Sequence, residues 1–196
     1  AVYAKYTNFG MQKFRIDFNG QRNLRLAEES KFTFKMPRYA ELLLDSYLVL
    51  NLPNIWSPIY PPETSTDEWK PYEFKWIKNL GAIMIKKVTI SVGGATLQEF
   101  TGEYLYNLVE RDFSESKKKM FYEMTGNVKE INSPGNAGAR VNQYPNAYYN
   151  RSSAGSEPSI RGRKLYIPIS PWFSHSSKMA FPMVSMQYNE LVIEVT

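Results

Sequence analysis

The sequence predicts an all-β fold: an eight-stranded antiparallel jelly-roll sandwich with a short inserted helix and long loops. Short runs of residues alternate between apolar and polar with the two-residue period of a strand that buries one face. Glycine pairs and prolines separate these runs. Regular alternation of strands with helices is absent, which favours a sandwich over a parallel sheet.

Two strands are predicted in the first forty residues. Residues 14–18 alternate with Phe or Ile at every second position, and the Asn19-Gly20 pair after them suits a tight turn into another strand. Residues 31–36 alternate as well, and Pro37 ends that run because proline cannot donate a ladder hydrogen bond. A strand with one buried face is expected in each run.

A continuously apolar run and a hairpin follow. Residues 47–52 are apolar at almost every position, which predicts a strand covered on both faces that stops at Pro53. Residues 83–92 carry alternating Val and Ile, and Gly93-Gly94 turns the chain back into residues 95–100. This hairpin is the clearest long-range feature of the sequence.

The β pattern breaks after residue 100. Residues 103–113 form one helical stripe with Thr101 as the expected N-cap, and residues 114–124 predict one or two further helical turns. Strands resume at 165–169 and 191–195, with 182–186 as a shorter candidate. The apolar residues of the helical stripe are Tyr104, Leu105, Leu108 and Val109.

Two long loops complete the chain. Five prolines fall between residues 53 and 71, where Trp56, Trp69 and Trp76 are expected to pin the loop to the body. Residues 125–162 are rich in Gly, Pro, Asn and Ser and predict an exposed loop. Since no repeat or internal boundary divides the chain, residues 1–196 are predicted to form a single domain.

The composition excludes several kinds of chemistry. The chain has no cysteine and one histidine, His175, so thiol nucleophiles, disulfides and most zinc, copper or iron sites are ruled out. His175 has serine neighbours but no glycine elbow, and the pairs Glu28-Glu29 and Asp67-Glu68 lie in polar surroundings. We therefore predict no catalytic, cofactor-binding or metal-ligating residue, and no enzyme.

Partners are constrained by the charge pattern. The net charge of +5 is spread along the chain, which predicts no specific nucleic-acid binding. No apolar run is long enough to insert in a membrane. Asn150-Arg151-Ser152 matches the glycosylation triplet, so Asn150 is a possible acceptor. The remaining candidates for phosphate contact or base stacking are Lys117, Lys118, Lys119, Arg161, Arg163, Lys164, Tyr144, Tyr148 and Tyr149.

Three groups of short motifs follow one another along nearly the whole chain. The first group is Lys5-Tyr6-Thr7-Asn8-Phe9 with Phe18-Asn19-Gly20. The second is Asn79-Leu80-Gly81, Ile85-Lys86-Lys87-Val88, Val92-Gly93-Gly94 and Gly102-Glu103-Tyr104-Leu105. The third is Leu165-Tyr166-Ile167-Pro168-Ile169, Trp172-Phe173, Ala180-Phe181-Pro182-Met183 and Gln187-Tyr188-Asn189-Glu190. Together these motifs resemble the N-terminal jelly roll of the double jelly-roll major capsid proteins of nucleocytoplasmic large DNA viruses, many of which carry His in place of Tyr6.

The resemblance implies a structural protein of the virion, built from homotrimers that form pseudo-hexagonal capsomers of an icosahedral shell. It implies neighbouring capsomers and minor capsid proteins as partners, and assembly in the host cell cytoplasm. A second jelly roll is expected in the family but is not visible in this chain, which predicts that residues 1–196 alone do not trimerise. A glycan-binding, lectin-like jelly roll is the alternative, and a cupin enzyme ranks third because it needs several histidines.

Overall fold

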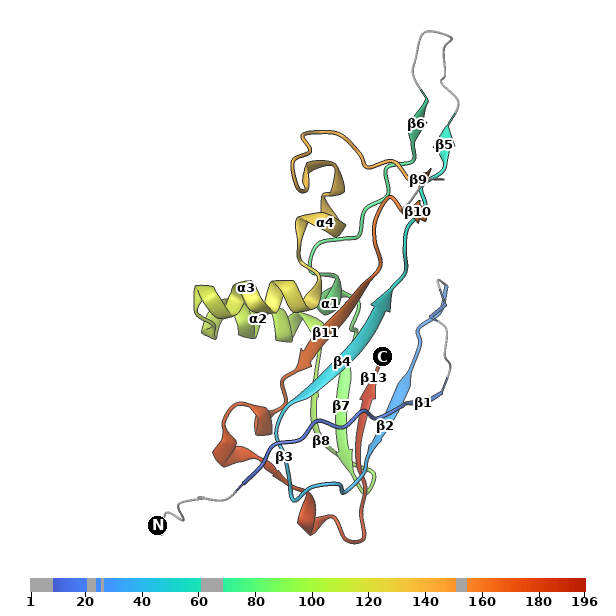
Figure 1. Ribbon diagram of the computed structural model, residues 1–196. Helices are drawn as coiled ribbons and strands as arrows, with labels where there is room; N and C mark the ends of the chain where they lie inside the picture. The colour runs from blue at the N-terminus through green and yellow to red at the C-terminus, as the bar shows by residue number, and fades with distance from the viewer. Residues whose placement is uncertain (1–8, 21–23, 26, 61–68, 151–154) are drawn as a thin grey trace.

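The computed structural model describes residues 9–20, 24–25, 27–60, 69–150 and 155–196. Its strands form an elongated body, from whose side a pair of helices, α2 and α3, projects (Figure 1). A two-stranded ribbon stands at one end of the body, and the 3-10 turns of residues 172–185 gather at the other (Figure 1).

The largest sheet is antiparallel and has five strands in the order β1-β2-β13-β7-β8. β7 and β8 form the hairpin predicted at Gly93-Gly94, and β13 lies between β2 and β7. Gly93 has a φ of +56°, which suits glycine at such a turn. The strand bounds are β1 Asn19–Gly20, β2 Phe32–Met36, β7 Val88–Val92, β8 Ala95–Phe100 and β13 Leu191–Val195.

A second layer is built on β4 and β11, which pair antiparallel over their whole length, from Ser46↔Ile169 to Leu52↔Arg163. Shorter ribbons extend the fold: β3 pairs with β12, β5 with β6, and β9 with β10. The bounds are β3 Leu42–Leu43, β4 Ser46–Leu52, β5 Ile59–Tyr60, β6 Lys70–Pro71, β9 Tyr148–Asn150, β10 Gly155–Glu157, β11 Arg163–Ile169 and β12 Phe181–Pro182.

The core lies between these layers. Apolar side chains at alternate positions of β7 and β13 are buried, as are those of β11, because each strand turns one face inward. Phe173, from a 3-10 turn, is fully buried and packs edge-on against Trp172. The main buried side chains are Val88, Ile90, Leu105, Leu165, Ile167, Phe173, Leu191, Ile193 and Val195.

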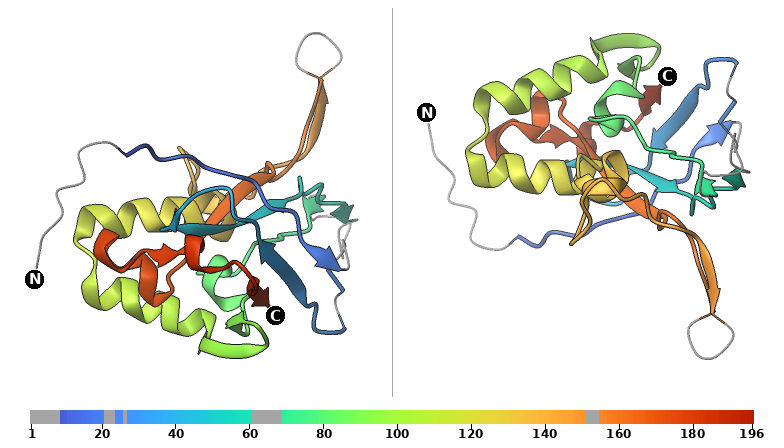
Figure 2. Two further views of the ribbon diagram at one scale, coloured as in Figure 1. Left: turned by 90° about the horizontal axis from the view of Figure 1, so that it is seen from below. Right: turned by 90° about the horizontal axis from the view of Figure 1, so that it is seen from above.

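Helices pack against one side of the body (Figure 2). The predicted helix is α2, Gly102–Asp112, and the Oγ1 of its N-cap Thr101 accepts a hydrogen bond of 3.3 Å from the Tyr104 amide. Tyr104 itself is exposed, so the buried stripe is narrower than predicted. The further turns form α3, a full helix antiparallel to α2 (Figure 2). The other helices are α1 Leu80–Ile83, α3 Glu115–Thr125, α4 Lys129–Asn132, and 3-10 turns η1 Pro134–Asn136, η2 Trp172–Ser174, η3 Ser177–Met179 and η4 Met183–Ser185.

The strand predicted at residues 14–18 is wrong. Those residues run along the outside of the body without a ladder partner among the described residues, and pairing begins only at Asn19. One of the alternating apolar residues still packs on the sheet: Phe18 lies edge-on against Phe32 and Phe34, with ring centroids 4.9 and 6.0 Å apart. Side-chain packing, not strand pairing, holds this segment.

Two other strand predictions need correction. Residues 83–87 are not part of the hairpin strand, because Ile83 ends α1 and β7 begins at Val88. In the 182–186 candidate only Pro182 is in a strand, and Met183–Ser185 form the turn η4. Proline supplies no ladder donor, so the chain leaves the ladder there.

The long loops also differ from expectation. Trp56 and Trp69 are 50% and 65% exposed, so only Trp76, which packs edge-on on Phe74, pins the proline-rich segment. Residues 125–162 are not simply an exposed loop, since Ile131 is buried in the core and its carbonyl accepts from the Trp76 amide at 2.9 Å.

The fold class is therefore mainly β with a few helices. The helix predicted at residues 103–113 is present as α2, and the one or two turns predicted at residues 114–124 form a longer helix than expected, because α3 has 11 residues. The described residues form thirteen strands, several only two residues long, so the count of eight is not confirmed.

Candidate functional site

The lone histidine is not part of a catalytic arrangement among the described residues. His175 is exposed and follows η2. Its neighbour Ser174 donates its hydroxyl to the Pro171 carbonyl at 2.9 Å, and Ser176 Oγ accepts from the Lys178 amide. The serines beside His175 thus serve local turns.

The acidic pairs behave as surface groups. Glu28 accepts from Arg25 at 2.6 Å, and Glu29 pairs with Lys86. Asp67 and Glu68 lie outside the described residues. No three His, Asp or Glu side chains gather as a metal site in the part of the chain that the structure describes. Within the same part, no helix is long and apolar enough to cross a bilayer.

Three of the six basic residues in the two clusters lie beside carboxylates. Lys118, in the middle of the basic run, lies 3.7 Å from Glu110 and 3.5 Å from Glu115. In the second cluster, Arg161 pairs with Glu157 at 2.7 Å and Arg163 with Glu123 at 3.0 Å. Lys117 lies 6.0 Å above the Phe113 ring, and Lys119 and Lys164 are exposed.

Tyr144 acts as an anchor instead of a stacking platform. Its hydroxyl lies 2.8 Å from Ser57 Oγ, and the Ser57 amide donates to Ser159 Oγ at 3.2 Å. These bonds tie residues 125–162 to the proline-rich segment. The side chains of Tyr148, Tyr149 and Asn150 lie outside what the structure describes, although their backbone forms β9.

A polar cluster joins α2 and α3. The Tyr122 hydroxyl donates to Glu110, and this bond, with burial and the negative charge, raises the pKa of Tyr122 to about 12. The same hydrogen bond lowers the pKa of Glu110, and the charge of Lys118 lowers it further. The cluster therefore holds α2 and α3 in a fixed position relative to each other.

The outer face of β4 and β11 is apolar and exposed. Tyr47, Val49 and Tyr166 are 43%, 49% and 43% exposed, and the register places Val49 opposite Tyr166 and Tyr47 opposite Pro168. Partial burial raises the pKa of the Tyr47 hydroxyl, with a smaller contribution from the Asp45 charge. We name this surface, residues Tyr47, Val49, Tyr166 and Pro168, the outer face.

The prediction that residues 47–52 are covered on both faces is therefore wrong within this chain. Leu48 and Leu50 turn toward the core, while Tyr47 and Val49 remain in water. The apolar run is visible in the sequence, but the exposure of Tyr47 and Val49 is not. The run itself was the sequence signal for this exposed face, because a strand with apolar side chains on both faces needs protein on both sides, and another chain can supply one of them.

The outward side of the five-stranded sheet is charged, unlike the apolar outer face of β4 and β11. On the outward side of the five-stranded sheet, Lys31 pairs with Glu194 at 2.9 Å and Lys87 with Glu99 at 3.4 Å. Thr89 also donates to Glu99, its cross-strand partner, at 3.1 Å. This side is suited to water, whereas the outer face of β4 and β11 is suited to contact with protein.

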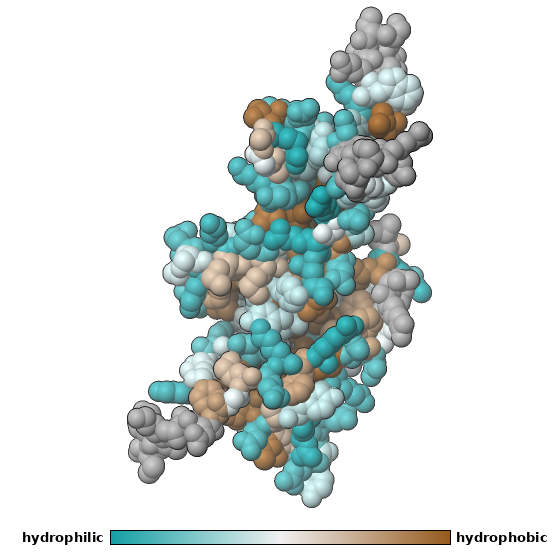
Figure 3. All heavy atoms as spheres, viewed as in Figure 1, coloured by the Kyte–Doolittle hydropathy of each residue, from teal (hydrophilic) through white to brown (hydrophobic). Residues whose placement is uncertain are grey.

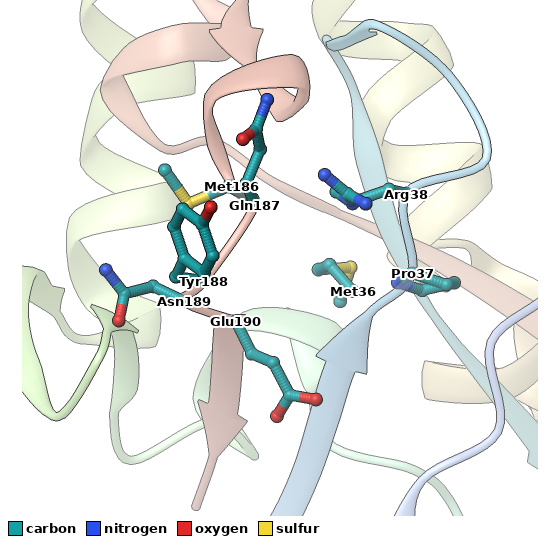
Figure 4. Close-up of a pocket in the computed structure, with 8 residues that line it drawn as sticks. All are labelled: Met36, Pro37, Arg38, Met186, Gln187, Tyr188, Asn189 and Glu190. Carbon is teal, nitrogen blue, oxygen red and sulfur yellow. The ribbon is translucent and has the colours of Figure 1, made fainter.

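A groove of about 370 Å³ lies between the end of β2 and the segment before β13. Tyr188 and Met186 stand on one wall, opposite Met36 and Arg38 (Figure 4). Tyr188 is 96% exposed, and Figure 3 shows hydrophilic and hydrophobic residues intermixed at this end of the body. The groove holds the motif Gln187-Tyr188-Asn189-Glu190, and its lining is Met36, Pro37, Arg38, Met186, Gln187, Tyr188, Asn189 and Glu190.

The fold and these surfaces define a β-rich protein with one apolar and one charged outer surface, and with no gathered catalytic group among the described residues. The family model for the major capsid protein N-terminus matches residues 1–196. The chain belongs to that family.

Individual relatives agree with this assignment. The chain is 27% identical to the major capsid protein of Frog virus 3 (isolate Goorha) over 169 residues, which is 84% of the chain and 32% of the relative. It is 22% identical to the major capsid protein of Phaeocystis pouchetii virus over 195 residues, 99% of the chain and 35% of the relative. The chain thus spans about a third of the length of these relatives.

Solved structures share the fold. The crystal structure of PBCV-1 VP54, fitted into a reconstruction of the virophage Sputnik, superposes with a TM-score of 0.65 at 14% identity and covers 100% of this chain and 36% of that chain. The Faustovirus major capsid protein gives a TM-score of 0.55 at 13% identity, covering 98% and 44%. The family match favours a capsid protein over the glycan-binding alternative.

Proposed function

We propose that this chain is the N-terminal jelly roll of a double jelly-roll major capsid protein. The match of the family model over residues 1–196 carries the proposal. The outer face supports it, because an apolar face on a β-sandwich is what a subunit in contact with neighbouring protein requires. The protein serves as a structural subunit of the virion shell and performs no catalysis.

In this proposal the working unit is a homotrimer that forms a pseudo-hexagonal capsomer of an icosahedral shell. Its partners are identical subunits, neighbouring capsomers and minor capsid proteins, and assembly takes place in the host cell cytoplasm. The relatives' greater length supports a division in which a second jelly roll supplies part of the contact surface.

Light scattering tests the trimer. Obligate interfaces usually bury more than ~2,000 Å², so a chain with only one of two contributing domains is expected to be monomeric or to aggregate. The full-length product of the reading frame is expected to have three times the mass of its subunit. A stable trimer of residues 1–196 would contradict the division of contacts between two jelly rolls, and a full-length monomer would contradict the capsid function.

Asn150 stays a candidate glycan acceptor. Its backbone pairs with Gly155 at the end of the β9–β10 ribbon, which projects from the body (Figure 2), and acceptor triplets need such accessible segments. Peptide mass spectrometry of virion protein, with and without glycosidase, decides the matter. A peptide containing Asn150 at its unmodified mass in both samples would remove the candidate.

A further inference from the structure

Residues 9–14 carry three large apolar side chains and have no ladder partner among the described residues. Residues 9–14, here called the arm, cross the outside of the body near its lower end (Figure 1). Phe9, Met11 and Phe14 are 73%, 72% and 47% exposed. At Gly10 a Cβ would meet no atom within 4 Å. The arm therefore leaves large apolar side chains and extended backbone in water.

The same chain contains a strand with one unpaired edge. Among the described residues β4 has a ladder partner only in β11, and its other edge has none. β4 has seven residues and contains neither proline nor charge. Proteins usually protect such an edge with charges, prolines, bulges or a covering segment, because an open edge pairs with other strands. The sequence of β4 itself supplies neither a charge nor a proline to protect this edge.

The chain's own arm has no ladder bond to that edge. Phe14, the last residue of the arm, packs on Tyr39 with ring centroids 4.9 Å apart, and Phe18, four residues further on, packs on Phe32 and Phe34 of β2. In the proposed capsid many identical copies pack together, so the β4 edge of a neighbouring copy is a partner that the arm can meet.

We infer that the arm of one copy pairs as an added strand with the free edge of β4 in a second copy. Phe9 and Met11, two residues apart, lie on one side of an extended strand, where they continue the outer face beside Tyr47 and Val49. Main-chain hydrogen bonds supply the pairing and the apolar side chains supply the fit, as in other cases of strand addition. This inference rests on the proposed capsid function.

Cysteine cross-linking tests the contact directly, because the chain has no native cysteine. Met11→Cys and Val49→Cys, co-expressed as separate full-length variants, should form a disulfide-linked pair of subunits under mild oxidation, since adjacent strands place Cα atoms within disulfide range. Tyr47→Cys and Asn51→Cys replace Val49→Cys to sample registers shifted by two residues. One of the three should cross-link several-fold more than the others.

Ser91→Cys is the matched control. Ser91 lies on β7, whose two edges are both paired, on β13 and β8. Met11→Cys with Ser91→Cys should give only background cross-linking. A backbone control separates pairing from packing: Gln12→Pro, which removes an amide donor from the exposed arm, should reduce the Met11–Val49 cross-link several-fold, while Gln12→Ala should not.

The outcomes distinguish this inference from the proposed function. Full-length trimers that form without any cross-link above the Ser91 background would overturn the arm contact and leave the capsid function standing. A disulfide within one chain of the double variant Met11→Cys/Val49→Cys would show that the arm reaches its own β4, which contradicts the inference. Failure to form any oligomer would count against both.

Discussion

Gly102, the first residue of α2, lies directly against the Ala82 carbonyl of α1: a Cβ at Gly102 would be 1.9 Å from that oxygen and 2.6 Å from the Ile85 carbonyl. The Gly102 amide donates to the Ile85 carbonyl at 3.1 Å. Two helices and the start of β7 meet here, and only a residue without a side chain permits this approach.

Gly102→Ala should therefore destabilise the fold. Because the obstructing atoms are backbone carbonyls and cannot rotate away, we expect a loss at the upper end of the ~1–3 kcal/mol range of overpacking, or beyond it. Urea unfolding followed by circular dichroism measures it. Gly10→Ala, in open space, is the control and should stay within about 0.5 kcal/mol. Equal effects of the two changes would refute the steric explanation.

Alkaline pH should loosen the α2–α3 pair. Tyr122 has its pKa raised from 10.0 to about 12 in the folded chain, so the folded state favours its neutral form. The associated stability is complete below pH 10.0 and is lost as the pH rises through about 12. Tyr122→Phe should flatten this decline, as measured by urea midpoints across the alkaline range. An unchanged alkaline decline in the variant would exclude Tyr122 as its source.

The carboxylate partner gives the opposite dependence. The pKa of Glu110 is lowered by the Tyr122 hydrogen bond, so its contribution is present above the ordinary carboxyl pKa of 4.5 and disappears as the pH falls below it. Glu110→Gln should remove this acid-side component. The midpoint difference between wild type and variant should shrink toward acid pH, and a constant difference would show that Glu110 charge is not involved.

Polar substitution of the outer face should affect assembly more than folding. Val49→Thr and Tyr166→Ser change side chains that are 49% and 43% exposed, so each should change the unfolding free energy by about 1 kcal/mol or less. The trimer fraction of the full-length protein, measured by light scattering, should fall. Ser91→Ala, on the polar side of the other sheet, should change neither. Wild-type assembly by the double variant would show that this face is not a contact surface.

Nucleic-acid binding should be weak and non-specific. Arg161, Arg163 and Lys118 already have carboxylate partners, which leaves the two basic clusters with fewer cations to replace counterions on a phosphate backbone. Fluorescence anisotropy with two unrelated DNA duplexes should give equal, weak binding that disappears with salt. A strong preference for one duplex at physiological salt would contradict this.

Local chemistry was enough to predict much of this fold. The β7–β8 hairpin follows from alternating Val and Ile around Gly93-Gly94, and α2 follows from its apolar stripe and the Thr101 cap. Strands β2, β11 and β13 lie where alternation placed them. These features depend on contacts between residues close in sequence, which periodicity and turn chemistry record directly.

Only the tertiary structure decided what covers each element. Residues 14–18 and β4 both carry strand-forming patterns, yet the first finds no ladder partner among the described residues and the second keeps half its apolar side chains in water. Ile131, in a segment without periodicity, is buried in the same core as residues of β7, β11 and β13, which are distant from it in sequence. A pattern of apolar residues indicates that one face of a strand or helix needs to be buried. The partner is chosen by long-range packing, in this chain or in a neighbouring one, and no local pattern encodes that choice.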